Sequence, residues 1–481
     1  MAQQFVEPCS RGIIEAQPCP RALRREIAPR RRRMVLAGCI LASSMAFIDS
    51  SALTVALPKL RAAVGADLAS VQWVLNGYVL ALASLTLIGG ALADTYGKAR
   101  MLAVGCLLFG AASVGCAAAA SVGWLIAARV VQGVAAALVT PASLALIGAT
   151  YPEEERNRAI GVWAAASALT TAAGPLLGGW LTENFGWQAV FWINPLVALA
   201  AVVLLWAYAP MDQLVPRRFD LVGAVIVAAA LAALAFGLSQ IGRGEAGAAA
   251  ASWSEPKIVV AAGLGLAGLA LYGFWERSSD HPMTPPRLAQ NGAFLGLNVA
   301  TLLLYAGLAV MFFLLPFDLV DRRGLSPTDA GLVFLPFTLG VGLLSRPFGS
   351  LADAVGARTM LIAGSLGATL GYAWLALGQG TSLLIGVIAP MGLLGIAFAV
   401  LVAPLTASVM SSVAQADQGL ASGINNAASH VAQLVGVAVA AGLGSLPSGY
   451  RLGLLAAAAV SAAGALAVGA MMPPARPDAP S

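Results

Sequence analysis

Asp49 and Arg129 are charged residues that stand inside long apolar stretches of the sequence. Burial of a carboxylate favours its neutral form, so Asp49 is suited to taking up and releasing a proton. A buried arginine costs about 2.5–3.5 kcal/mol on insertion scales and needs a partner or a wet cavity. We predict that the two residues form a proton-exchanging pair, in which Arg129 opposes protonation of Asp49 in one conformation. Two alternatives stay open: Asp49 is a neutral residue hydrogen-bonded to Ser43, Ser50 or a neighbouring helix, or Arg129 extends to the nearest aqueous surface.

Other polar residues in the apolar stretches are candidate binding residues. Gln132 follows Arg129 by three positions and therefore lies on the same helical face. Trp73 and Asn76 are also three apart, and Asn426 and Gln433 belong to a further polar stripe. Such residues often only join helices to one another. We expect these polar residues to contact a small-molecule substrate.

The sequence offers no arrangement typical of an enzyme or a metal centre. The five cysteines and two histidines have no metal-ligand spacing, and no nucleophile–base motif is visible. We therefore expect no catalytic residue, no metal and no cofactor.

The positioning elements are predicted to be membrane-spanning helices. Hydrophobic residues make up 59% of the 481 residues, and charged residues 10% against about 25% in soluble domains. The apolar runs are about 20 residues long, enough to cross a bilayer as helices, and strand periodicity is absent. The net charge of +5 is scattered between these runs, which argues against nucleic-acid binding. The basic run at 30–33 precedes the first span and is expected to contact acidic lipids at the cytoplasmic surface.

Fourteen spans are predicted, and the pair least clearly defined is the seventh and eighth. Lysine and arginine gather in the loops on the side of the N-terminal tail, so both termini are expected in the cytoplasm. The predicted organisation is a basic tail (1–33), a six-helix half (34–210), a two-helix insert with its loops (211–292), a second six-helix half (293–471) and a C-terminal tail (472–481).

An internal repeat supports two parallel halves. The segment from Gly90 to Gly97 recurs as the segment from Gly349 to Gly356, each time after the second span of its half. Glycines in this short turn permit a tight bend and close helix approach. The acidic and basic residues of the turn can pair with each other, with a helix end or with lipid. The candidate conformational latch consists of Gly90, Asp94, Gly97, Lys98, Arg100, Asp353 and Arg358.

Four ordered motifs resemble the major facilitator superfamily, and specifically its fourteen-span drug:proton antiporters. They are Gly90-x-Leu92-Ala93-Asp94-x-x-Gly97-Lys98-x-Arg100, the segment from Asp49 to Pro58, Arg129-Val-Val-Gln132-Gly133 followed by Pro141, and Gly174-Pro175-Leu-Leu-Gly178-Gly179 with the segment from Trp187 to Pro195. One departure is Gln188, where the family often has an arginine. Gly174 and Gly178 also lie on one helical face, where they permit close backbone approach.

The resemblance implies the major facilitator fold and export of small hydrophobic drugs, antibiotics or dyes across the cell membrane. The proton gradient would supply the energy for transport. The latch would stabilise one of the two conformations that open to opposite sides of the membrane. The Gly174–Gly179 motif would indicate export. One titratable carboxylate favours neutral or monovalent cationic substrates, carried by a monomer in the cytoplasmic membrane. The alternative is a proton-coupled transporter of a physiological metabolite, such as an endogenous natural product, a siderophore or an amino acid.

Overall fold

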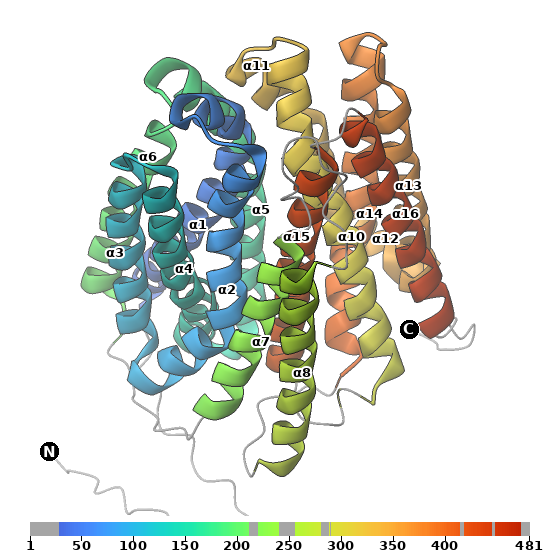
Figure 1. Cartoon of the computed structure of the whole chain (residues 1–481). Helices are drawn as coiled ribbons and strands as arrows, with labels where there is room; N and C mark the ends of the chain where they lie inside the picture. Colours follow the sequence, from blue (N-terminus) through green and yellow to red (C-terminus); the bar gives the residue numbers. More distant parts are fainter. Residues whose placement is uncertain are drawn as a thin grey trace, which may run out of the picture.

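The computed structural model describes residues 28–210, 220–239, 255–279, 288, 290–413, 418–444 and 448–472. Within these ranges the chain is helical and contains no strand (Figure 1). This agrees with the all-α class predicted from composition. The predicted N-terminal tail lies almost entirely outside the described residues, as do most of the loops around 211–292 and the C-terminal tail after 472.

The helices follow one another along the chain in three groups. The first group is α1 (Pro29–Val64), α2 (Leu68–Tyr96), α3 (Lys98–Ala117), α4 (Val122–Thr150), α5 (Glu153–Phe185) and α6 (Ala189–Tyr208). The pair α7 (Leu221–Ser239) and α8 (Pro256–Ser278) follows. The third group is α10 (Gly292–Phe317) with a π-helical end (Asp318–Arg322), α11 (Pro327–Leu332), α12 (Leu335–Val355), α13 (Ala357–Leu377), a π-helical turn (Leu384–Ile388) leading into α14 (Ala389–Ser411), α15 (Gln418–Gly444) and α16 (Gly449–Met471).

Local sequence explains several helix boundaries. Asp67 caps α2 by accepting a hydrogen bond from the Ser70 amide at 2.8 Å. The two repeated turns end on Gly97 and Gly356, whose φ values of 103° and 92° suit glycine alone among common residues. The repeat found in the sequence therefore has the same backbone turn in both halves.

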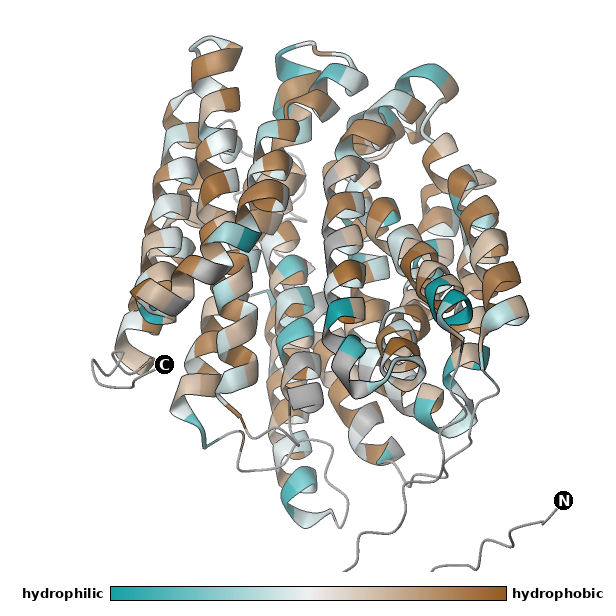
Figure 2. Ribbon diagram, turned by 180° about the vertical axis from the view of Figure 1, so that it is seen from behind, coloured by the Kyte–Doolittle hydropathy of each residue, from teal (hydrophilic) through white to brown (hydrophobic). Residues whose placement is uncertain are grey.

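The surface of the bundle is that of a multi-pass membrane protein. Eleven helices in the described part are long and apolar enough to cross a bilayer, and α2 adds a twelfth if its two parts, bent by 54°, form one span. Large apolar side chains point outward, including Trp206 at 90% and Leu466 at 74% exposure. Hydrophobic residues recur along the length of the helices (Figure 2). Lipid contact explains this exposure, since water would penalise it.

The two ends of the bundle pack differently. We call the end at which α1 finishes and α11 lies the distal end, and the end at which α1 begins the proximal end (Figure 1). At the distal end one apolar core includes residues of both halves, such as Leu57 and Phe334. Toward the proximal end there are two further cores: one is built from the first half, as at Val35, with Leu434 of α15 added, and the other from the second half, as at Leu405. The halves are thus joined most closely at the distal end.

Candidate functional site

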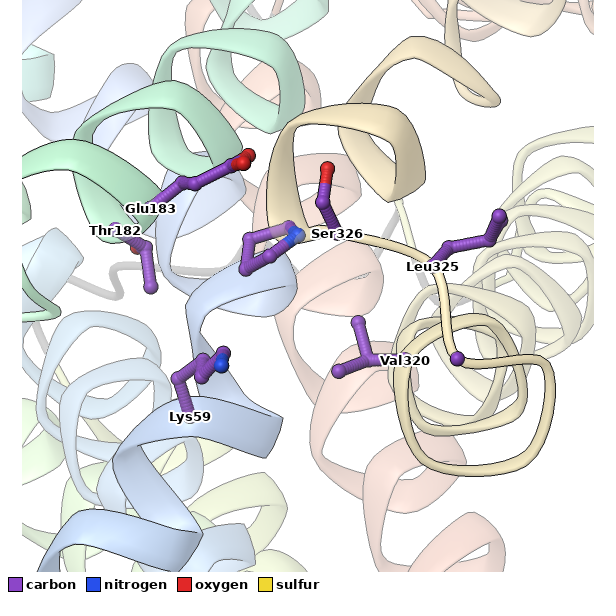
Figure 3. A pocket seen from close by; sticks show the side chains of 8 residues that line it. Lys59, Thr182, Glu183, Val320, Leu325 and Ser326 are labelled. Carbon is purple, nitrogen blue, oxygen red and sulfur yellow. The ribbon is translucent and has the colours of Figure 1, made fainter.

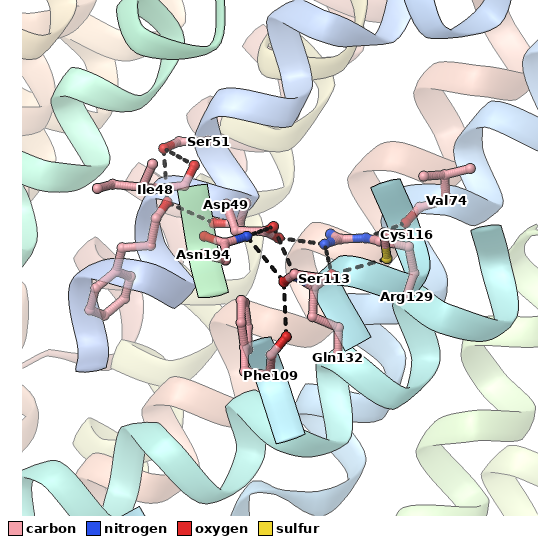
Figure 4. A network of polar contacts seen from close by, with 12 residues as sticks. Ile48, Asp49, Ser51, Val74, Phe109, Ser113, Cys116, Arg129, Gln132 and Asn194 are labelled. Carbon is pink, nitrogen blue, oxygen red and sulfur yellow. Dashed lines mark hydrogen bonds and ion pairs between the residues drawn. The ribbon is translucent and has the colours of Figure 1, made fainter. Parts of the chain in front are cut away.

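Asp49 lies at the centre of a buried polar network inside the first half (Figure 4). Its Oδ1 accepts hydrogen bonds from Gln132 Nε2 at 2.9 Å and from Asn194 Nδ2 at 2.8 Å. Its Oδ2 forms an ion pair with Arg129 Nη1. Of the partners in the first alternative above, Ser43 and Ser50 do not hold Asp49, whereas the neighbouring helices α4 and α6 do, through Gln132 and Asn194.

Arg129 is fully buried and does not extend to an aqueous surface. Its Nε donates to the Val74 carbonyl at 3.0 Å, and its Nη1 also donates to Gln132 Oε1 at 2.7 Å. The guanidinium carbon lies 4.2 Å from the centre of the Tyr78 ring, a cation–π contact that compensates part of the lost hydration. The predicted pairing of Arg129 with Asp49 is present in the structure.

Two members of the network were not predicted from the sequence. Ser113 on α3 accepts from Gln132 Nε2 at 2.7 Å, and Asn194 on α6 is 1% exposed and bonds Asp49 directly. Asn194 belongs to the fourth motif, and its amide inside an apolar helix was the available signal. Gln132, expected as a substrate contact, donates a hydrogen bond to the carboxylate in this conformation, and its contact with a substrate stays a prediction. Five helices, α1, α2, α3, α4 and α6, thus contribute to one site.

The geometry suits an ionised carboxylate that is closed to solvent. Asp49 receives donors from three side chains, and a deprotonated carboxylate only accepts hydrogen bonds. Asp49, Arg129 and Gln132 each have 0% exposure. A proton can reach Asp49 only after the surrounding helices move. The arrangement holds a charged pair away from water.

Two other acidic residues are buried among those whose burial the structure describes. Asp318 is 2% exposed at the distal end and is held by Arg322 at 2.8 Å and Arg323 at 2.9 Å. Glu276, at 4% exposure, lies near the end of α8. Both lie near helix ends, whereas Asp49 lies in the middle of α1.

The candidate latch occupies the proximal turn between α2 and α3. Asp94 pairs with Lys98 at 3.1 Å, an i,i+4 contact. The close helix approach expected at Gly90 is found one residue earlier, because a Cβ on Gly89 would overlap the Ala137 backbone, whereas one on Gly90 would make an ordinary contact. The prediction for Gly90 is therefore off by one residue, because the local sequence does not determine the register of α2 relative to α4.

The second copy of the turn is anchored within its own half. Arg358 Nη2 donates to the Gly469 carbonyl of α16 at 2.6 Å. The side chain of Asp353 lies outside the described residues.

The glycine motif of α5 sits between the two halves. A Cβ on Gly178 would come within 2.6 Å of Ala52 Cα, and one on Gly174 would collide with Ser51, so both glycines pack against α1. Gly179 faces the other half, where a Cβ would overlap the Pro327 carbonyl of α11.

Gly331 of α11 makes the reciprocal approach to the Pro175 carbonyl of α5. The motif thus combines packing within the first half with closure against the second half. Its predicted role in close helix packing is seen directly, while its bearing on the direction of transport stays a prediction.

A pocket of about 440 Å³ lies beside this contact (Figure 3). Lys59, Thr182, Glu183, Val320, Gly324, Leu325, Ser326 and Pro327 line it. Glu183 Oε2 accepts a hydrogen bond from the Thr328 amide at 3.1 Å, and Arg61 pairs with Asp321 at 3.5 Å. These polar contacts join the two halves at the distal end.

Glu183→Gln is expected to weaken the distal contact. Hydrogen bonds from Thr328, then Ser326, and the charge of Lys59 lower the pKa of Glu183 below its ordinary value of 4.5. The contribution of the Glu183 carboxylate to the stability of the distal contact is therefore fully present above pH 4.5, and it is lost as the pH falls through the lowered pKa. Spin labels at Thr182 and Leu325 measure the distance between the two halves at the distal end. In the wild type this distance should stay constant from about neutral pH down to the lowered pKa of Glu183. Unchanged distances in Glu183→Gln would contradict a role for this carboxylate.

The tentative binding residues lie in different surroundings. Trp73 packs on Phe236 of α7 with ring centres 5.9 Å apart. Asn76 is 2% exposed, and neither of its side-chain polar atoms has a partner among the described residues. On α15, Asn426 is exposed and Gln433 half-buried. Among the described residues no hydrogen bond or ring contact joins these four side chains to one another, and their role in binding stays a prediction.

Comparisons with known proteins identify the family. The Major Facilitator Superfamily description matches residues 39–275 and 297–481. The "Multidrug resistance protein Stp" of Mycobacterium tuberculosis is 32% identical over 82% of this chain and 72% of its own length. The "Cephamycin export protein CmcT" of Amycolatopsis lactamdurans is 36% identical over 81% of this chain and 80% of its own.

The "Lincomycin resistance protein" of Streptomyces lincolnensis is 30% identical over 83% of this chain and 82% of its own. Among solved structures, a peptide transporter POT in complex with sulfate superposes with a TM-score of 0.68 at 15% identity, over 92% of this chain and 94% of that one. A bacterial homolog of the human lysosomal transporter Spinster has a TM-score of 0.67 at 16% identity, over 92% of this chain and 98% of that one. Fold, sequence motifs and relatives agree, and the chain belongs to the major facilitator superfamily.

Proposed function

We propose that this protein is a proton-coupled antiporter that exports small hydrophobic molecules, including antibiotics, by alternating access. The observation that carries the proposal is the sealed ion pair of Asp49 and Arg129. A buried carboxylate with a buried cationic partner is the expected device for binding a proton in one state and releasing it in the other. The names of the relatives, which state multidrug resistance and cephamycin export, support the direction and the substrate class.

The distal contacts indicate which state the structure represents. The shared core, the reciprocal glycine contacts and the Glu183 hydrogen bond close the distal end. With the distal end outside, we propose that this conformation is closed toward the outside, with Asp49 paired to Arg129. Opening of the distal end would admit water and a proton, and Arg129 would keep Val74, Gln132 and the Tyr78 ring as partners.

The proposed topology has fourteen spans in the cytoplasmic membrane, with both termini in the cytoplasm. The long helix α5 and the helix α7 would complete the spans that length and hydropathy already support. Two six-helix halves would flank the pair formed by α7 and α8, as the sequence predicts.

One carboxylate limits the substrates that can be driven. Moving one charge through 100 mV yields about 2.3 kcal/mol, against about 1.4 kcal/mol for each tenfold gradient. One-for-one exchange with a monovalent cation moves no net charge and uses only the pH gradient. Neutral and monovalent cationic substrates are therefore favoured over divalent ones. A physiological metabolite of such chemistry is the alternative substrate.

Proteoliposomes with an acidic interior provide the test. Protons leaving through the protein should drive ethidium, a panel of neutral antibiotics, or candidate metabolites into the vesicles against their gradients. Collapse of the pH gradient by an ionophore should abolish accumulation. Accumulation that persists after collapse would contradict proton coupling, and accumulation confined to metabolites would favour the alternative.

A further inference from the structure

A second cavity of about 440 Å³ lies at the proximal end, where α1 and α5 begin. It is separate from the Asp49 network and from the distal pocket. Its lining residues are Pro29, Arg32, Arg33, Leu36, Tyr151, Glu155, Arg158, Ala159 and Val162.

The arginines at this cavity differ in whether they form hydrogen bonds and ion pairs with other residues. Arg32 pairs with Glu155 at 2.9 Å, and the neighbouring Arg31 donates to the carbonyls of Tyr208 and Ala209 at the end of α6. Arg33 and Arg158 are exposed and have no hydrogen bond or ion pair with another residue among those described. Two guanidinium groups therefore line the cavity with their donors available.

Part of the cavity lining is apolar. Leu36, Ala159 and Val162 contribute it, and Val162 is 47% exposed. An exposed apolar side chain therefore adjoins the basic groups of the cavity. With the proximal end in the cytoplasm, as proposed above, basic groups beside apolar side chains match an amphiphile with an anionic head.

We propose that this cavity binds the phosphate of an anionic phospholipid headgroup. Arginine presents a planar fork of donors that suits phosphate oxygens, and two such forks fit one phosphodiester. Arg32, already oriented by Glu155, fixes the position of the α1 end relative to α5. Free phosphate shares the charge chemistry, but the apolar part of the lining favours a lipid, whose glycerol and acyl groups would cover Val162.

The test compares two double variants in nanodiscs that contain phosphatidylcholine with a minor share of phosphatidylglycerol. Arg33→Gln with Arg158→Gln removes both available forks and keeps the pair of Arg32 with Glu155. Arg33→Lys with Arg158→Lys keeps the charge but not the fork. Arg277→Gln, at the exposed end of α8, is the matched control. Native mass spectrometry then counts the phosphatidylglycerol retained by each protein.

Loss of two arginine contacts at about 1 kcal/mol each corresponds to roughly twenty-five-fold weaker retention. We expect this loss of phosphatidylglycerol in the glutamine variant, a partial loss in the lysine variant and no loss in Arg277→Gln. Glycerol phosphate added to the wild type should displace no lipid. Equal retention by wild type and glutamine variant, or an equal loss in Arg277→Gln, would overturn the site. Displacement of the lipid by inorganic phosphate at matched concentration would overturn the assignment to a lipid.

Discussion

Asp49→Asn is expected to abolish accumulation of substrate against its gradient while downhill movement persists. Asparagine fits the same space and still accepts a hydrogen bond from Arg129, but it cannot titrate. The variant leaves Arg129 as an uncompensated buried charge, a situation that costs about 3–5 kcal/mol when a buried pair is broken. Transport of ethidium into acid-interior proteoliposomes measures the coupling, and thermal unfolding measures the stability.

A second variant separates coupling from folding. Asp49→Asn with Arg129→Gln removes both charges, so the protein should regain stability without regaining uphill transport. Asp67→Asn is the matched control, because Asp67 is an exposed helix cap for which asparagine serves equally well. Normal uphill transport with unchanged pH dependence in Asp49→Asn would assign the carboxylate a purely structural role.

Gly179→Ala is expected to open the distal end. The added Cβ would overlap the Pro327 carbonyl of the other half, and overpacking of this kind costs about 1–3 kcal/mol. Because the overlap exists only when the halves meet distally, the conformational equilibrium should shift by roughly 5- to 150-fold toward the distally open state. Spin labels at Lys59 and Leu325 should report a longer mean distance.

Two glycines on the same helix serve as controls for this shift. Gly161 has no atom within 4 Å of a built Cβ, so Gly161→Ala should change neither distance nor stability appreciably. Gly178→Ala should instead lower thermal stability, because its contact is with α1 in the same half. An unchanged distance in Gly179→Ala would show that the α5–α11 contact does not control distal closure.

Physical cost explains which parts of the site were predictable. Charged residues in apolar stretches are so unfavourable that Asp49 and Arg129 had to find partners, and they found each other. Ser113 and Asn194 carry smaller penalties and make equally good contacts between helices. Their selection depends on how α3 and α6 rotate against α1, which local sequence does not determine.

The same reasoning applies to the fold. The all-helical class and the repeated turns followed from composition, run length and the glycines at 97 and 356. The register at Gly89 and the position of Trp73 against α7 depend on packing between helices far apart in the chain. The sequence alone does not report which conformation the two halves adopt.

The reciprocal contact between α5 and α11 has a thermodynamic consequence. Each half offers a glycine to a backbone carbonyl of the other, so neither partner has a side-chain rotamer to immobilise. Ion pairs such as that of Arg61 and Asp321 lose rotamer freedom when they form. Closure through backbone contacts therefore carries little side-chain entropy cost, and heating should weaken it less than a gate built from long charged side chains.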